Sequence, residues 1–264
     1  MHVSTRAILG ALSLFLLPAA RVAAAPPETA VLIAKMRAVV WPAQPSFRTL
    51  TITVTADQGD KVTWVARQAR TRVAGGGRML TVLQTPADLR GTAWLVQEGP
   101  DQTVQWVWEP FIRRVRKLIP VEGHQAFLSS DFTYADLGVV DLHSTTKLLG
   151  EETHNGVRAY QVEEVPRSHW YYTRIVDWIA ADTFFPLQRD FYDPSNVLWK
   201  VETFDQVTEI NGVPTVLRRR MADRQTGSTT QIDVSEVRYG VDLADNLFDP
   251  TQLPRAIDAS PAWK

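Results

Sequence analysis

From Phe47 onward the sequence alternates apolar and polar residues with a period of two, interrupted by short turn motifs. In residues 49–56, Leu50, Ile52 and Val54 would share one face of a strand and the threonines the other. Turn motifs such as Ile210-Asn211-Gly212 recur roughly every 8–12 residues. The pattern predicts about a dozen strands in an antiparallel meander. So long a sheet has to curl or close, which leaves a concave face to be filled.

Three segments predict helices. Residues 30–40 carry one apolar stripe, with Thr29 as a candidate N-cap and Trp41-Pro42 as the end. Ser130–Leu137 predicts one helical turn capped by Asp131, and Asp245–Leu253 a short C-terminal helix. No long linker follows residue 41, so residues 26–264 predict one mainly β domain. We expect a large curved antiparallel sheet with a helix at each end and one in the middle, the helices filling its concave face.

Residues 1–25 have the features of a secretory signal peptide. Arg6 precedes an apolar run from Ala7 to Leu17, and Ala23-Ala24-Ala25 offers a cleavage site. The apolar run is too short to span ~30 Å of hydrocarbon. We therefore expect export and cleavage near Ala25. The chain contains no cysteine, which excludes disulfides and a lipid-modified cysteine.

Composition and motifs argue against several function classes. The formal net charge is −1, and near-neutrality does not favour nucleic acid as a partner. Four histidines, at positions 124, 143, 154 and 169, lack metal-ligand spacing, and no GxSxG motif is present. The adjacent pairs Glu151-Glu152 and Glu163-Glu164 would point to opposite faces of a strand, so neither pair predicts a catalytic dyad. We expect no catalytic residues, no metal, no cofactor and no enzymatic activity.

Two basic runs have two interpretations each. In the strand predicted over 113–118, Arg114 and Arg116 would point one way, and Arg113 and Lys117 the other. This strand could be an outer strand held by salt bridges, or Arg114 and Arg116 could contact an anionic headgroup or a protein partner. A second run, residues 218–220, would add to one positive face if the two strands were adjacent.

Tryptophans fall mostly in predicted strands. Their simplest role is core packing, but a half-barrel with an apolar concave face could use the same side chains to line a ligand cavity.

A series of motifs resembles the outer membrane lipoprotein-sorting (LolA-like) family. These motifs are Gly91-Thr92-Ala93-Trp94-Leu95, Trp106-Val107-Trp108-Glu109-Pro110, the Arg-rich stretch 113–117, and residues 127–137, which read FLSSDFTYADL. Weaker matches follow at Asn211-Gly212-Val213-Pro214 and Leu247-Phe248. The resemblance covers roughly residues 28–253, and Ser129-Ser130 departs from the expected Gly-Ser.

The resemblance implies a LolA/LolB-like fold, an unclosed antiparallel β half-barrel with helices covering the concave face. Its apolar cavity would hold acyl chains in the periplasm. A monomeric carrier of a lipid or lipoprotein would follow, with an inner-membrane efflux-type transporter as a possible partner. Cavity or lid residues would then be Trp64, Trp94, Trp106, Trp108, Phe132 and Tyr134, the last two facing the interior. An alternative is a lipid-sensing or interaction domain of a periplasmic complex, and a third is an enzyme, because a fold does not fix a function.

Overall fold

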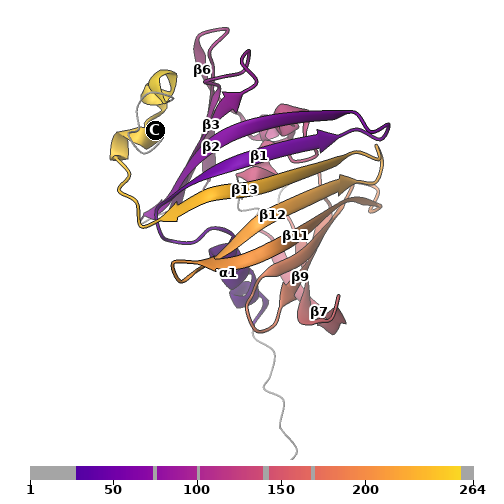
Figure 1. Cartoon of the computed structure of the whole chain (residues 1–264). Helices are drawn as coiled ribbons and strands as arrows, with labels where there is room; N and C mark the ends of the chain where they lie inside the picture. The colour runs from indigo at the N-terminus through magenta and orange to yellow at the C-terminus, as the bar shows by residue number, and fades with distance from the viewer. Residues whose placement is uncertain (1–27, 74–75, 100–101, 139–142, 168–169, 257–264) are drawn as a thin grey trace, which may run out of the picture.

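A computed structural model of the chain describes residues 28–73, 76–99, 102–138, 143–167 and 170–256 (Figure 1). The predicted signal peptide, residues 1–25, lies outside the described residues. None of the helices in the described ranges is long and apolar enough to cross a membrane.

Thirteen antiparallel strands form one sheet in the order β6-β5-β4-β3-β2-β1-β13-β12-β11-β10-β9-β8-β7. Two meanders, β1–β6 and β7–β13, are joined where the first strand pairs with the last (Figure 1). Within the described residues the two edge strands, β6 and β7, do not pair, so the half-barrel is unclosed, as predicted. The strands are β1 Ser46–Thr55, β2 Lys61–Val73, β3 Gly76–Thr85, β4 Ala93–Glu98, β5 Thr103–Glu109, β6 Arg114–Lys117, β7 Thr145–His154, β8 Val157–Val165, β9 Arg174–Ala180, β10 Pro186–Tyr192, β11 Leu198–Ile210, β12 Val213–Asp223 and β13 Thr229–Tyr239.

Strand register sorts the side chains into an inner and an outer face. Ile52 of β1 pairs with Trp64 of β2 and with Ile232 of β13, and all three are buried on the inner face. The alternation seen in the sequence therefore fixes which residues face inward. The two basic runs are not on adjacent strands, because six strands separate β6 from β12.

Helices cover both faces, not only the concave one. On the inner face lie α1, Thr29–Val40, and the connection between β6 and β7, which contains η1, Pro120–His124, η2, Phe127–Ser129, and α2, Tyr134–Leu137. We call residues 118–138 the plug. The C-terminal 3-10 helices, η3 Asp245–Phe248 and η4 Pro250–Arg255, instead pack on the outer face against β3–β6. A single C-terminal helix on the concave face was expected, so that part of the prediction is wrong.

Trp41 fastens the end of α1 to the sheet. Its ring is 2% exposed and lies against Gly77 of β3, where an added Cβ would come within 2.6 Å of the ring. Arg70 stacks on the same ring, with its Cζ 4.7 Å from the ring centroid. Only a residue without a side chain fits at position 77.

We predict that Gly77→Ala lowers the free energy of unfolding by about 1–3 kcal/mol, because the added methyl group overpacks the Trp41 contact. Urea unfolding measures the change. Gly150→Ala is the matched control, since a Cβ there meets nothing within 4 Å. Equal stabilities of the two variants would contradict this role of Gly77.

Candidate functional site: the covered inner face

Three aromatic side chains join the plug to the sheet. Trp94 of β4 lies 5.1 Å from Phe127 and 5.5 Å from Tyr134 between ring centroids, and Phe127 lies 5.2 Å from Tyr134. The Trp94 indole N–H donates to Gln105 Oε1 at 2.9 Å, which leaves its ring free for packing. Tilted and edge-on pairs at these distances add stability beyond the buried area.

Asp131 ties the plug to β13. Its carboxylate accepts hydrogen bonds from Ser228 Oγ and, at 2.7 Å, from Thr230 Oγ1, while its backbone N–H donates to Thr230 Oγ1 at 2.8 Å. Lys200 Nζ donates to the Asp131 carbonyl oxygen at 2.7 Å. Asp131 is therefore a tether and not the predicted helix cap. Thr133 caps α2 instead, in a reciprocal box with Asp136.

Asp136 ties the other side of the plug to the segment before β9. The Tyr171 and Tyr172 hydroxyls donate to its two carboxylate oxygens at 3.2 and 3.1 Å. Burial, followed by the nearby Asp136 charge, raises the pKa of both tyrosines, so both remain protonated donors. Further polar contacts between the plug and the sheet are the Arg116–Glu122 ion pair and a backbone hydrogen bond from the Leu118 N–H to the Gln105 carbonyl oxygen at 2.9 Å. The plug also packs on the sheet through apolar contacts.

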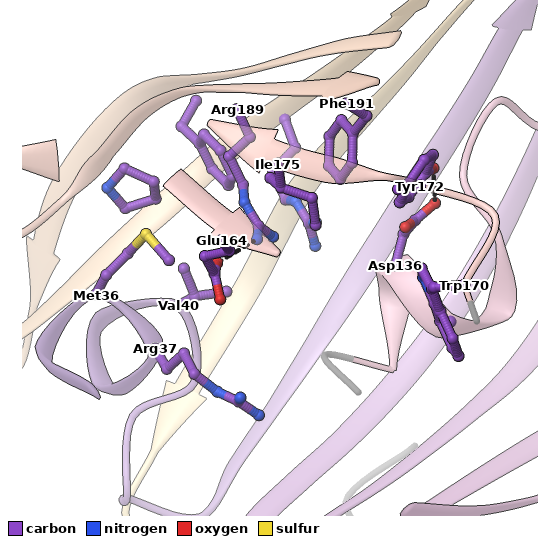
Figure 2. Close-up of a pocket in the computed structure, with 14 residues that line it drawn as sticks. Met36, Arg37, Val40, Asp136, Glu164, Trp170, Tyr172, Ile175, Arg189 and Phe191 are labelled. Atoms are coloured by element: carbon purple, nitrogen blue, oxygen red, sulfur yellow. Dashed lines mark hydrogen bonds and ion pairs between the residues drawn. The ribbon is translucent and has the colours of Figure 1, made fainter. Parts of the chain in front are cut away.

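Two narrow cavities lie beneath the plug and α1, and each has a volume of about 60 Å³. The tyrosine cavity is lined by α1, α2 and β8–β12, with Met36 and Val40 on one side and Asp136, Trp170 and Tyr172 on another (Figure 2). The arginine cavity is lined mainly by β1–β4 and β12–β13 with Arg48, Arg70 and Arg219. Val40, Phe204 and Arg219 border both cavities. Ligand pockets usually measure ~300–1,000 Å³, so the inner face is closed in this state.

A third, open groove of about 560 Å³ runs beside α1. Glu98 lies in its wall and accepts hydrogen bonds from Arg37 and Arg72, both at 3.3 Å, and from the Gly77 N–H at 2.9 Å. Its lining is more charged than that of the arginine cavity, with Arg37, Arg72, Glu98, Glu164 and Arg167 among its residues. The groove suits an acyl chain less well than the apolar inner wall.

Buried ion pairs lie on the inner face of the second meander, where β8 to β12 contribute one charged side chain each. Arg219 Nη2 lies 2.6 Å from Glu202 Oε1, and its guanidinium stacks 5.2 Å from the Phe132 centroid and 5.5 Å from that of Phe204. Arg189 bonds Asp177 at 2.5 Å and lies 3.4 Å from Glu164. Sequence reasoning missed this cluster, because its members are far apart in the chain and each strand contributes only one or two. The inward-pointing charges within otherwise apolar faces were the only available signal.

The predicted site residues divide between the two faces. Trp94, Phe132 and Tyr134 pack together with the plug, and Trp64 is buried on the inner face but is not among the residues lining the two cavities. Trp106 and Trp108 pair with Leu95 and Ala93 on the outer face and pack against η3 and η4. The prediction that these two tryptophans line the inner cavity is therefore wrong. Side chains alternate between the two faces along paired strands, which places Trp106 and Trp108 on the face opposite to that of Trp94. The C-terminal helices cover this outer face, which explains why large apolar side chains occur there.

The two arginines of β6 that were predicted to contact a headgroup or partner differ in their surroundings. Arg116 is ion-paired with Glu122 of the plug, in agreement with the salt-bridge interpretation. Arg114 is exposed and lies opposite Glu109 in the register of the hairpin. Beside it, at the turn before β6, the side chains of Phe111 and Ile112 are 95% and 54% exposed. In the described residues, no group of three or more His, Cys, Asp and Glu side chains is arranged to hold a metal.

Glu164 predicts a pH dependence of stability. Burial, followed by the neighbouring Asp177, raises the pKa of its carboxyl from 4.5 to about 8, although Arg189 and Arg37 oppose the shift. Between these values the folded chain holds a proton that the unfolded chain has released, so rising pH destabilises the fold. We expect the melting temperature to fall between pH 5 and 8 by more in the wild type than in Glu164→Gln. Parallel melting curves would contradict the shifted pKa.

Comparisons with known proteins agree with this fold. A family model described as an uncharacterized protein matches residues 75–255. An outer membrane lipoprotein-sorting protein domain from Vibrio parahaemolyticus is 25% identical with a TM-score of 0.79, over 85% of this chain and 97% of its own. A DUF1329 family protein from Desulfovibrio piger is 28% identical with a TM-score of 0.77, over 84% and 96%.

A LolA superfamily protein from Nitrosomonas europaea has a TM-score of 0.68 at 20% identity, over 83% of this chain and 96% of its own, and shows the fold alone. No curated protein matches the sequence.

Proposed function

The chain belongs to the LolA-like, outer membrane lipoprotein-sorting family, and from this premise we propose that it is a carrier that binds the acyl chains of a lipid or lipoprotein. It works by binding and not by catalysis. Exposing a C16 chain to water costs on the order of 12 kcal/mol at ~0.8 kcal/mol per CH₂, so a lipid needs such a carrier to cross an aqueous compartment.

One observation supports this proposal most directly. The inner wall under the plug is apolar, with Leu50, Ile52, Met79, Trp94 and Ile232 among its residues. A short segment covers it and is held by packing and a few side-chain hydrogen bonds, without strand pairing to the sheet. Displacing the plug would uncover this apolar wall inside the half-barrel, and cavities of about 60 Å³ have to widen before they can hold an acyl chain.

The compartment and partners belong to the same proposal. The predicted signal peptide and the name of the Vibrio relative support a periplasmic carrier. In the proposal this carrier is a monomer that shuttles its cargo between membrane-associated partners. The exposed Phe111 and Ile112 beside Arg114 supply apolar side chains next to a cation, which suits contact with an anionic membrane surface or with an inner-membrane efflux-type transporter.

Acyl binding is tested with a fluorescent fatty-acid probe and by native mass spectrometry after incubation with phospholipid vesicles. We expect co-purifying lipid, and at least a tenfold loss of probe affinity in Trp94→Gln, which places a polar group in the inner wall. Trp106→Gln is the matched control on the outer face, and its affinity should stay within about twofold of the wild type. A lipid-free mass with no probe binding would contradict the carrier function.

Membrane contact at the β5–β6 turn is tested separately by vesicle co-sedimentation. We expect Phe111→Ser to reduce association with anionic vesicles severalfold while leaving probe binding in solution unchanged, because Phe111 lies outside the cavities. Val62→Ser, at another exposed apolar site, is the control (its side chain is 53% exposed). Unchanged sedimentation of Phe111→Ser would remove this turn from the proposal.

A further inference from the structure

Three arginine side chains from three strands line the arginine cavity. Arg48 lies on β1 in phase with the inward-facing Leu50 and Ile52, opposite a bulge whose extra residue is on β13 between Ser235 and Arg238. Arg70 lies on the neighbouring β2, opposite Met79 of β3, and Arg219 lies on β12, opposite Ile232 of β13. The pairing of β1 with β13 brings the three together on the inner face.

Arg48 and Arg70 are buried cations without a carboxylate partner among the described residues. Each is 7% exposed, and the Nε atom of each lacks any hydrogen-bond partner. The contacts of Arg48 are the Ser46 hydroxyl at 2.9 Å and the Tyr239 ring at 5.9 Å from its Cζ, and Arg70 stacks on Trp41. Only Arg219 has a carboxylate, that of Glu202.

Such an arrangement is costly in a closed protein. An unpaired buried charge costs several kcal/mol, and apolar residues of similar size are often more stable in its place. Burial, and then repulsion from Arg48 and Arg219, lowers the pKa of Arg70 well below its usual value. Departures of this kind from folding rules concentrate at functional sites. The cavity holds two positive charges for which the described part of the fold supplies no counter-ion.

The rest of the lining is suited to an amphiphile. Gln68 and Thr81, hydrogen-bonded to each other at 3.1 Å, lie beside the arginines and can contact an oxyanion. Leu50, Ile52, Met79 and Val234 continue the wall as an apolar surface. The polar end and the apolar wall meet in one cavity.

We propose that Arg48, Arg70 and Arg219 form a buried oxyanion site that takes the carboxylate or phosphate head of the acyl ligand, with the chain along the apolar wall. The inference rests on the proposed carrier function and specifies its ligand as anionic, bound with the head inside. Guanidinium groups bind carboxylate and phosphate through paired N–H donors.

Competition against the fluorescent acyl probe tests the head-group preference in the full-length mature protein. Three ligands of one chain length are compared below their aggregation concentrations: hexadecanoate, hexadecyl phosphate and the uncharged hexadecan-1-ol. We expect both anions to bind about tenfold or more tightly than the alcohol, since a hydrogen bond to a charged group contributes about 1.5–3 kcal/mol. Equal affinities of the three would overturn the oxyanion site and leave the carrier proposal standing.

Substitutions in the arginine cavity test whether its side chains cause the preference for anionic ligands. Arg48→Gln and Arg70→Gln should each remove most of the preference for anions and keep the affinity for hexadecan-1-ol. Arg218→Gln is the matched control, because this arginine is paired with Asp233 and points to the outer face. An anion preference that survives in both cavity variants would overturn the assignment. If the variants fail to fold, the wild-type comparison and the control still decide whether the preference exists.

Calorimetry with inorganic phosphate alone separates a lipid head group from a free anion. Under the proposal, inorganic phosphate binds far more weakly than hexadecyl phosphate. The Arg70→Gln variant no longer binds inorganic phosphate. Phosphate binding with no binding of any of the three amphiphiles would overturn both the head-group assignment and the carrier function.

Discussion

Pairing of the first strand with the last is the interaction on which the rest of the structure depends. β1 and β13 pair from Ser46↔Tyr239 to Thr55↔Thr229, and the two strands are separated in sequence by most of the described chain. Without this pairing the chain would be two separate meanders with two more unpaired edges. With it, Arg48 and Arg70 from the first meander lie on one inner face with Arg219 and Glu202 from the second. The cavity and its charges are therefore a product of long-range topology.

The plug follows β6 in the chain and covers the inner face without adding a strand to the sheet. Asp131 holds one side to β13, Asp136 holds the other to Tyr171 and Tyr172, and the Trp94–Phe127–Tyr134 cluster fills the space between. Each hydrogen bond of this kind contributes only about 0.5–1.5 kcal/mol, or about 1.5–3 kcal/mol where a carboxylate is involved. A cover held in this way can be displaced by a ligand that buries a long acyl chain in its place, because binding shifts the equilibrium toward the open state.

Strand alternation and turn chemistry were enough to predict a long curved antiparallel sheet and α1, and the family resemblance supplied the expectation that the sheet stays unclosed. They could not predict which of two aromatic strands faces inward: Trp94 and Trp106 carry the same signal, and only the docking of η3 and η4 on the outer face separates them. The inner charges were missed for the same reason. Glu164, Asp177 and Arg189 lie on three different strands. In the sequence Arg219 is only the middle residue of a basic run, and the strand register shows that it points inward while its neighbours Arg218 and Arg220 point outward.

Hydrogen exchange of the plug amides tests most directly whether the inner face opens to take an acyl chain. The N–H groups of Tyr134, Leu137 and Gly138, which are all hydrogen-bonded to carbonyl oxygens within the plug, should exchange far faster than those of β1 and β13. Their exchange should also change on adding an acyl ligand, while that of the outer-face helices η3 and η4 should not. Plug amides that exchange only with global unfolding, at the same rate with and without ligand, would contradict an opening plug and with it the carrier function.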